Sequence, residues 1–376
     1  MSKFDEAALE LHRVNKGKLG VAAKVPVKNR DDLSKAYTPG VAAVSRAIAE
    51  DKSLMYEYTG KGNMVAVVSD GSAVLGLGNI GPEAAYPVME GKSLLFKEFA
   101  GVEAFPIVLD TQNSDEIVRI VCALAPGFGG INLEDIAAPR CFEIEAELKR
   151  RLKIPIFHDD QHGTAIVVLA GLINALKVVG KNKSVKIVIN GAGSAGMAIT
   201  DLLHAYGFSN LTVVDSRGAI YLGREGLNAK KAAVAEFSNL EKREGGLDEM
   251  MNDSDVFIGV SKAGLVSQDM VRSMNEGAIV FAMANPDPEI TEDDAKSAGA
   301  AVVATGRSDS VNQLNNVLVF PGLFRGALDA RIEQFDQAMY VRAAEALAGL
   351  VENVEAESII PSPFDEQVAE VVAAAV

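Results

Sequence analysis

The strongest constraint on the fold is a glycine pattern in the second half of the chain. Gly191, Gly193 and Gly196 form G-x-G-x-x-G between a β-branched run at 185–190 and an apolar helical pattern at 197–205. In a strand–turn–helix unit, the first glycine allows a tight turn, the second lets a pyrophosphate approach, and the third allows close helix packing. Main-chain N–H groups at the helix start then face the phosphates. The pattern predicts a dinucleotide site; the alternative is a purely structural turn.

The residues around the glycines extend this prediction. Ser194 and Ala195 lie between the second and third glycines, at the predicted start of the phosphate-binding helix. The next predicted strand, 210–214, is followed by Asp215, about 20 residues beyond the pattern, where an acidic residue binds the ribose hydroxyls. A carboxylate there favours NAD because it repels a 2′-phosphate, but the adjacent Arg217 offers a partner for that phosphate. Both NAD and NADP stay open as cofactors.

A second G-x-G-x-x-G occurs at Gly76, Gly78 and Gly81. Its context is poorer, because Pro82 follows directly and the next acid at a strand end, Asp110, comes too late in the chain. We interpret this segment as a sharp loop beside an active site rather than as a second dinucleotide site.

Strand-like and helical patterns alternate along most of the chain, which is typical of parallel sheets covered by helices. The sequence therefore predicts an α/β protein of two domains: an N-terminal α/β substrate and metal domain, 1–160, and a C-terminal Rossmann-type, doubly wound parallel sheet with a helical tail, 161–376. The expected strands are 64–68, 73–77, 104–109, 130–133, 155–157, 185–190, 210–214, 256–259, 279–282 and 301–304. The expected helices include 82–99, 114–123, 140–152, 163–179, 329–351 and 365–376.

Charge and composition exclude several classes of protein. The chain carries 36 basic and 51 acidic residues, a formal net charge of −15, which disfavours nucleic acid as a partner. We expect no signal peptide at 1–11 and no apolar run of membrane-spanning length. Cys122 and Cys141 are too few for a disulfide framework. These features predict a cytoplasmic protein.

Four carboxylates follow two of the predicted strands. Glu134 and Asp135 come after 130–133, and Asp159 and Asp160 come after 155–157. Because parallel strands end on one rim of a sheet, these acids are expected to crowd together, and a divalent cation relieves such crowding. Oxygen ligands favour Mg²⁺ or Mn²⁺; the nearby histidines have neither a cysteine nor the helical spacing that zinc sites use. Helix capping is the alternative role of these acids.

Several further motifs run in one order through most of the chain: 37–42 (YTPGVA), 70–81 (DGSAVLGLGNIG), 91–92 (GK), 132–136 (NLEDI), 157–165 (FHDDQHGTA), 191–196 (GAGSAG), 284–286 (ANP) and 314–322 (LNNVLVFPG). Through these motifs the sequence resembles the malic enzyme family, in its short bacterial form.

The resemblance implies roles that the residues alone do not. It implies Lys92 as general base and Tyr37 as general acid, whereas by sequence alone Lys97 is as good a candidate as Lys92. One departure concerns the substrate carboxylate, since long members of the family carry an arginine where this chain has Ala73. The remaining implied residues are Glu134, Asp135 and Asp160 as metal ligands with Asp159 as a catalytic residue beside them, and Asn285 and Asn316 as contacts to cofactor and substrate.

The implied reaction is oxidative decarboxylation of (S)-malate to pyruvate and CO₂ with reduction of NAD or NADP. The alternative functions are those of a malolactic-type or oxaloacetate-decarboxylating lyase on the same scaffold, an amino-acid dehydrogenase, and a non-catalytic dinucleotide or malate sensor. The resemblance further implies a homodimer, in which Tyr37 of one subunit completes the neighbour's site.

Overall fold

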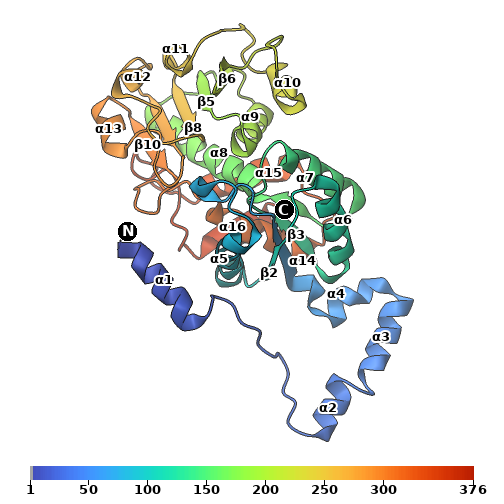
Figure 1. The fold of residues 1–376 in the computed structure, drawn as a ribbon. Coiled ribbons are helices and arrows are strands. Elements are labelled where there is room, and N and C mark those ends of the chain that lie inside the picture. Colours follow the sequence, from blue (N-terminus) through green and yellow to red (C-terminus); the bar gives the residue numbers. More distant parts are fainter. Residues whose placement is uncertain (1–2) are drawn as a thin grey trace.

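The computed structural model describes residues 3–376 as two sheet-centred units with an N-terminal arm (Figure 1). The first sheet has four parallel strands in the order β2-β1-β3-β4. Its strands and flanking helices are β1 (Met64–Ser69), α5 (Pro82–Ala100), β2 (Glu103–Val108), α6 (Ser114–Leu124), β3 (Gly130–Leu133), α7 (Arg140–Arg151) and β4 (Ile156–His158).

The second sheet has six strands in the order β10-β9-β8-β5-β6-β7. The order reverses between β5 and β8, which is the switch point where open α/β sheets bind ligands. The sheet is not wholly parallel as predicted, because the short edge strand β7 runs antiparallel to β6. Its elements are β5 (Ile187–Asn190), α9 (Ser194–Tyr206), β6 (Leu211–Asp215), β7 (Gly218–Ala219), α10 (Ala229–Ala235), α11 (Leu247–Met251), β8 (Val256–Gly259), α12 (Gln268–Arg272), β9 (Ile279–Ala282), α13 (Glu292–Ser297) and β10 (Val302–Thr305).

Helix α8 (Asp159–Val179) leads from the first sheet to the second. It begins four residues earlier than predicted, so Asp159 and Asp160 lie in its first turn. With 21 residues and a mean hydropathy of 1.7 it is long and apolar enough to cross a membrane, so the prediction of no such segment is wrong by this criterion. Two-thirds of its apolar window, 67%, is buried inside the protein, where α8 packs against α9 and α15 (Gln337–Gly349). Its apolarity is that of a core helix.

The C-terminal helices return to the first unit. Phe320 and Phe324 of α14 (Phe320–Ala330) pack against Phe96 of α5, with ring centroids 4.7 and 5.4 Å apart. The helix predicted over 329–351 is in fact two, because the chain turns at Arg331 with φ +51° before α15 begins. A last helix, α16 (Gln367–Ala374), packs on α14 after the proline-containing break.

One predicted strand is absent. Residues 73–77 form a tight turn that closes with a bridge between Val74 and Gly78. The backbone of Val74 bridges to Gly78 within the turn instead of pairing with a strand of the sheet, and both neighbours of β1 are already β2 and β3. A Cβ at Gly76 would lie 2.5 Å from the carbonyl oxygen of Asn285, so this loop lies against the second unit beside the cleft, as predicted for the second glycine pattern.

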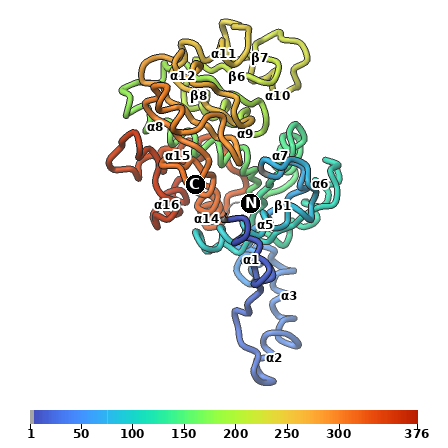
Figure 2. Tube along the Cα trace, turned by 60° about the vertical axis from the view of Figure 1, so that its left-hand side comes forward, coloured from blue at the N-terminus to red at the C-terminus, as the bar shows by residue number. Residues whose placement is uncertain are grey.

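The N-terminal arm carries α1 (Lys3–Asn15), α2 (Arg30–Ala36) and α3 (Val41–Glu50), and α4 (Met55–Tyr58) leads from it into the body. Both views show α2 and α3 standing away from the two sheets, and Figure 2 shows α1 beside α5. Apolar side chains along the arm are exposed, which makes this segment unlike the rest of the chain. They include Phe4, Leu9, Leu11, Val14, Leu19, Val21, Val25, Val27, Leu33, Val41 and Val44.

Candidate functional site

Three carboxylates gather at the carboxyl end of the first sheet. Glu134 and Asp135 follow β3, and Asp160 lies in the first turn of α8. One oxygen of each lies within 4.8 Å of the others. The main-chain N–H of Asp135 also donates to Oδ2 of Asp160, at 2.8 Å, which ties the two strand ends together. The structure thus brings together the three residues predicted to hold a metal.

The backbone at Asp135 has an uncommon conformation. Its φ is +55°, in the left-handed region that residues other than glycine seldom adopt. The main-chain carbonyl accepts from Ala73 N at 3.0 Å, so contacts on both sides hold the strained residue in place. Such conformations persist where the surrounding structure enforces them and they concentrate at functional sites.

Lys92 reaches this cluster from α5. Its buried Nζ lies 2.5 Å from Oδ2 of Asp159 and 2.9 Å from Oε1 of Glu134, and 4.2 Å above the ring of Phe320. Burial alone would lower the pKa of Lys92, but the Asp159 and Glu134 carboxylates outweigh it and raise that pKa. The ammonium is therefore protonated in this arrangement. Lys97, the alternative by sequence, is half-exposed and pairs with Glu103 on the surface.

The acids of the cluster are held against their electrostatic preference. Burial raises the pKa of Asp159, Glu134 and Asp160, and the single positive charge of Lys92 only partly opposes this. A buried carboxylate in this situation favours either a proton or a cation. Three carboxylate ligands with no histidine or cysteine among them fit Mg²⁺ or Mn²⁺.

The glycine turn of the second unit has the geometry predicted for phosphate binding. Gly191 has φ +122°, and a Cβ at Gly196 would lie 1.7 Å from the carbonyl oxygen of Gly191, so neither position accepts a side chain. A Cβ at Gly193 would meet nothing within 4 Å, which leaves that side open. Helix α9 begins directly after it, at Ser194.

A cleft of about 690 Å³ joins the carboxylate cluster to this turn. Asn316 also donates to the Asp159 carboxylate, which links the second unit to the Lys92 network. The cleft between the two sheets is therefore lined by the residues predicted to hold the metal, by the predicted base Lys92, and by the predicted cofactor and substrate contacts Asn285 and Asn316. Among the residues that line the cleft are Lys92, Glu134, Asp135, Asp160, Ser194, Ala195, Asn285 and Asn316.

Asp215 lies at the end of β6, as predicted, but it is paired with two cations. Arg224 contacts both carboxylate oxygens, at 3.1 and 2.5 Å, and Lys231 Nζ lies 2.7 Å from Oδ2. Burial would raise the pKa of Asp215, but these hydrogen bonds hold it well below its usual range. Arg217, the cation considered from sequence, instead donates its guanidinium to the carbonyl of Gly226.

Tyr37 is not brought to the cleft of its own chain. It lies at the end of α2 on the arm, with 67% of its surface exposed. Within one chain, the structure separates the predicted general acid from Lys92.

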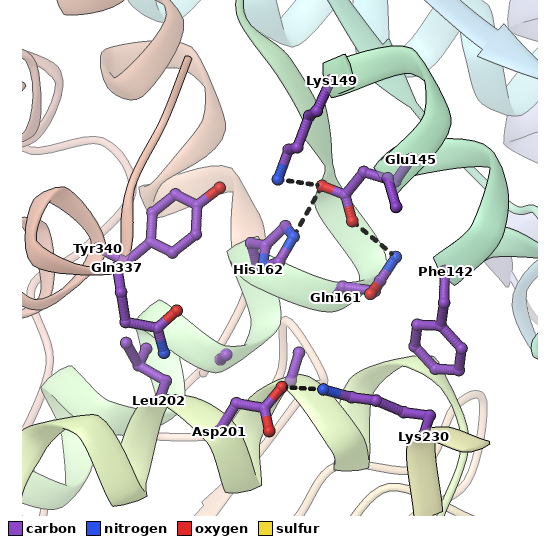
Figure 3. A pocket seen from close by; sticks show the side chains of 13 residues that line it. Phe142, Glu145, Lys149, Gln161, His162, Asp201, Leu202, Lys230, Gln337 and Tyr340 are labelled. Carbon is purple, nitrogen blue, oxygen red and sulfur yellow. Dashed lines mark hydrogen bonds and ion pairs between the residues drawn. The ribbon is translucent and has the colours of Figure 1, made fainter. Parts of the chain in front are cut away.

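The far side of the first turn of α8 faces a different pocket, of about 220 Å³ (Figure 3). There Glu145 accepts hydrogen bonds from His162 at 2.8 Å and from Gln161 at 3.3 Å, and pairs with Lys149 at 2.8 Å. Tyr340 stacks on the His162 ring. This network anchors the first turn of α8, which carries Asp159 and Asp160, and it gives a structural role to His162, which by sequence is a hinge residue near the site.

Sequence reasoning missed three charged residues: Lys18, which lines the cleft, and Arg224 and Lys231, which pair with Asp215. Lys18 lines the cleft from the segment after α1. Nothing in the spacing of these residues signals their positions, because each comes from a segment outside the motifs and arrives through tertiary packing.

Known proteins match this chain over nearly its whole length. Residues 16–116 match the malic enzyme N-terminal domain, and 161–376 match the malic enzyme NAD-binding domain. The chain is 59% identical to a bifunctional malic/malolactic enzyme of Bacillus subtilis, over 99% of this chain and 92% of the relative. It is 55% identical to an NAD-dependent malic enzyme of Geobacillus stearothermophilus, over 96% and 76%. The crystal structure of the NAD-dependent malic enzyme of Thermotoga maritima superposes with a TM-score of 0.95 at 48% identity, covering 98% of each chain.

Proposed function

This chain belongs to the malic enzyme family, and we propose that the cleft between its two sheets is where it oxidises and decarboxylates malate. The reaction converts (S)-malate to pyruvate and CO₂ and reduces NAD or NADP, the cofactors of related malic enzymes. The carrying observation is the convergence of Lys92, the three-carboxylate cluster and the dinucleotide turn on one cavity. With its two free thiols, the protein fits a reducing compartment such as the cytoplasm.

Purified protein incubated with (S)-malate, Mn²⁺ and either NAD or NADP tests the proposal. Pyruvate formed in equal amount with reduced cofactor supports it. Lactate formed without reduced cofactor would assign the malolactic reaction instead, and activity that survives a chelator would favour an amino-acid dehydrogenase. Ligand-dependent melting shifts with no turnover would identify a sensor.

We assign proton removal from the C2 hydroxyl to Lys92. In the pairing seen here Lys92 is protonated, so it becomes a base only as its carboxylate partners are engaged elsewhere. Glu134 pairs with Lys92 and also belongs to the three-carboxylate cluster. A cation bound by that cluster would therefore weaken the hold of Glu134 on the Lys92 proton. A divalent cation held by Glu134, Asp135 and Asp160 would supply the Lewis acid that stabilises the negative charge left as CO₂ departs. Asp159 orients Lys92 and receives Asn316 from the other unit.

The general acid comes from a second copy of the chain. Tyr37 lies on an arm whose apolar side chains are exposed, and such surfaces mark interfaces between proteins. We infer a homodimer in which the arm docks on its neighbour and Tyr37 delivers the proton to C3 in the neighbour's cleft.

Mixing two inactive variants tests this arrangement. Tyr37→Phe and Lys92→Ala are each expected to be inactive, and mixed dimers restore one intact site if the residues come from different chains. Random reassortment makes half of the dimers mixed, so about one quarter of wild-type activity should return after denaturation and refolding together. Refolding each variant alone is the control. No recovery in the mixture would show that both residues act in one chain.

The pairing of Asp215 favours NADP as a substrate. A lone carboxylate repels a 2′-phosphate, but here Arg224 and Lys231 supply two positive charges against one negative. We propose that these two cations bind the 2′-phosphate of NADP, while the Asp215 carboxylate still accepts the ribose hydroxyl of NAD.

Alanine at Arg224 or Lys231 is expected to raise KM for NADP by about 10- to 100-fold, the value of a lost charge-assisted hydrogen bond, and to change KM for NAD only a few-fold. Steady-state kinetics with both cofactors measure this. Lys230→Ala is the matched control, because Lys230 is adjacent to Lys231 but pairs with Asp201. Equal losses for NAD and NADP would mean that the pair only supports the loop.

A further inference from the structure

The cleft has a deficit of positive charge for its proposed substrate. Lys92 pairs with Glu134 and Asp159, and its charge also acts on Asp160, while Asp135 belongs to the same three-carboxylate cluster, so negative charges outnumber positive ones there. A divalent cation removes two of these charges. Malate carries two carboxylates of its own, so the part of the substrate that the metal does not bind needs a further cation.

Lys18 is in place to supply that charge. Among the described residues that line the cleft, the cationic side chains are Lys18 and Lys92. Lys92 is engaged by two carboxylates, whereas the Nζ of Lys18 donates to a neutral group, the carbonyl of Pro87, at 2.8 Å. Burial lowers the pKa of Lys18, because the ammonium is partly withdrawn from water and Glu90 compensates only in part. The group is thus short of a counter-ion.

The position of Lys18 is fixed by contacts with α5. Its main-chain N–H donates to Oε1 of Glu90 at 3.4 Å, and Gly17, at φ +102°, lets the chain pass close to that carboxylate. A Cβ added at Gly91 would lie 3.3 Å from the Nζ of Lys18. The ammonium therefore lies over a residue without a side chain, directly before Lys92 in the same helix.

We propose that Lys18 binds the malate carboxylate that the metal does not hold, and that it selects dicarboxylates over 2-hydroxy monocarboxylates. The inference rests on the proposed function of the cleft. It supplies from the N-terminal segment the cation that the sequence lacks at Ala73, which lines the same cleft. Lys18 takes no part in hydride or proton transfer, so its role is in substrate affinity.

Lys18→Met keeps the length of the side chain and removes its charge. KM for malate is expected to rise about 10- to 100-fold, while kcat and KM for the dinucleotide change no more than a few-fold. Lys18→Arg should keep KM for malate near wild type. Lys16→Met is the matched control, since Lys16 is an exposed lysine two residues away that does not line the cleft.

Calorimetry separates this proposal from the proposed function. Binding of malate and of (S)-lactate is measured with Mn²⁺ present, and circular dichroism confirms that each variant is folded. The expected result is that Lys18→Met weakens malate binding about 10- to 100-fold and leaves lactate binding unchanged. If wild type binds malate without turnover, the proposed function fails and the Lys18 assignment still stands or falls on this comparison. Unchanged malate binding in Lys18→Met, or equal weakening for both acids, would overturn it.

Discussion

Replacing Lys92 by alanine lowers kcat by about 10²- to 10⁴-fold, the usual contribution of a positioned general base. The side chain is buried between Asp159, Glu134 and the ring of Phe320, so solvent cannot readily replace it as a proton acceptor. Because a base must be deprotonated to act and the pKa of Lys92 is raised, wild-type kcat should increase with pH until that group loses its proton. Stopped-time assays of pyruvate across pH measure both effects.

Lys97→Ala is the control for this prediction. Lys97 lies five residues further along α5 and pairs with Glu103 at the surface, where an ion pair contributes little. Its activity should stay within a factor of two of wild type. If Lys92→Ala keeps more than a tenth of wild-type kcat, with an unchanged pH profile, Lys92 is not the base.

Removing the metal ligand Asp160 has an effect of comparable size. Asp160→Asn is expected to lose about 10³-fold or more in kcat/KM, because Lewis-acid stabilisation contributes several kcal/mol. Calorimetry should show that Mn²⁺ binding is lost or greatly weakened. A chelator should abolish wild-type activity, and added Mn²⁺ should restore it.

Asp160→Asn is expected to lower activity without lowering the thermal stability of the metal-free protein. This combination distinguishes a metal ligand from a residue that only supports the fold. Burial raises the pKa of Asp160, so its ionised form disfavours folding until a cation binds. Metal-free Asp160→Asn should therefore unfold at the same temperature as wild type or higher, but Mn²⁺ should no longer raise that temperature. Asp293→Asn, in the exposed first turn of α13, is the control. A variant that binds Mn²⁺ as wild type does would remove Asp160 from the metal site.

The parts of the protein that the sequence predicts are those encoded by local chemistry. The glycine turn at Gly191 was predictable because its tight geometry excludes side chains at two positions. The carboxylates after β3 and at the start of α8 were predictable because parallel strands end on one rim, although the predicted helix began four residues too late to include Asp160. The strand expected at 73–77 was wrong because a short apolar run also fits a tight turn, and here Val74 bridges to Gly78 within the segment.

Tertiary structure decided which charges meet. By sequence Lys92 and Lys97 are equivalent, and only the packing of α5 against α8 and α14 buries one and exposes the other. A lone Asp215 would repel a 2′-phosphate, but Arg224 and Lys231 pair with it and make the net charge of the group positive. Lys18 reaches the cleft from a segment far from Lys92 in the sequence. Electrostatic energy depends on distance and burial, which motif spacing does not record. The sequence by itself determined the chemical groups and the fold that carries them; the tertiary structure determined their neighbours, and with them their charge states.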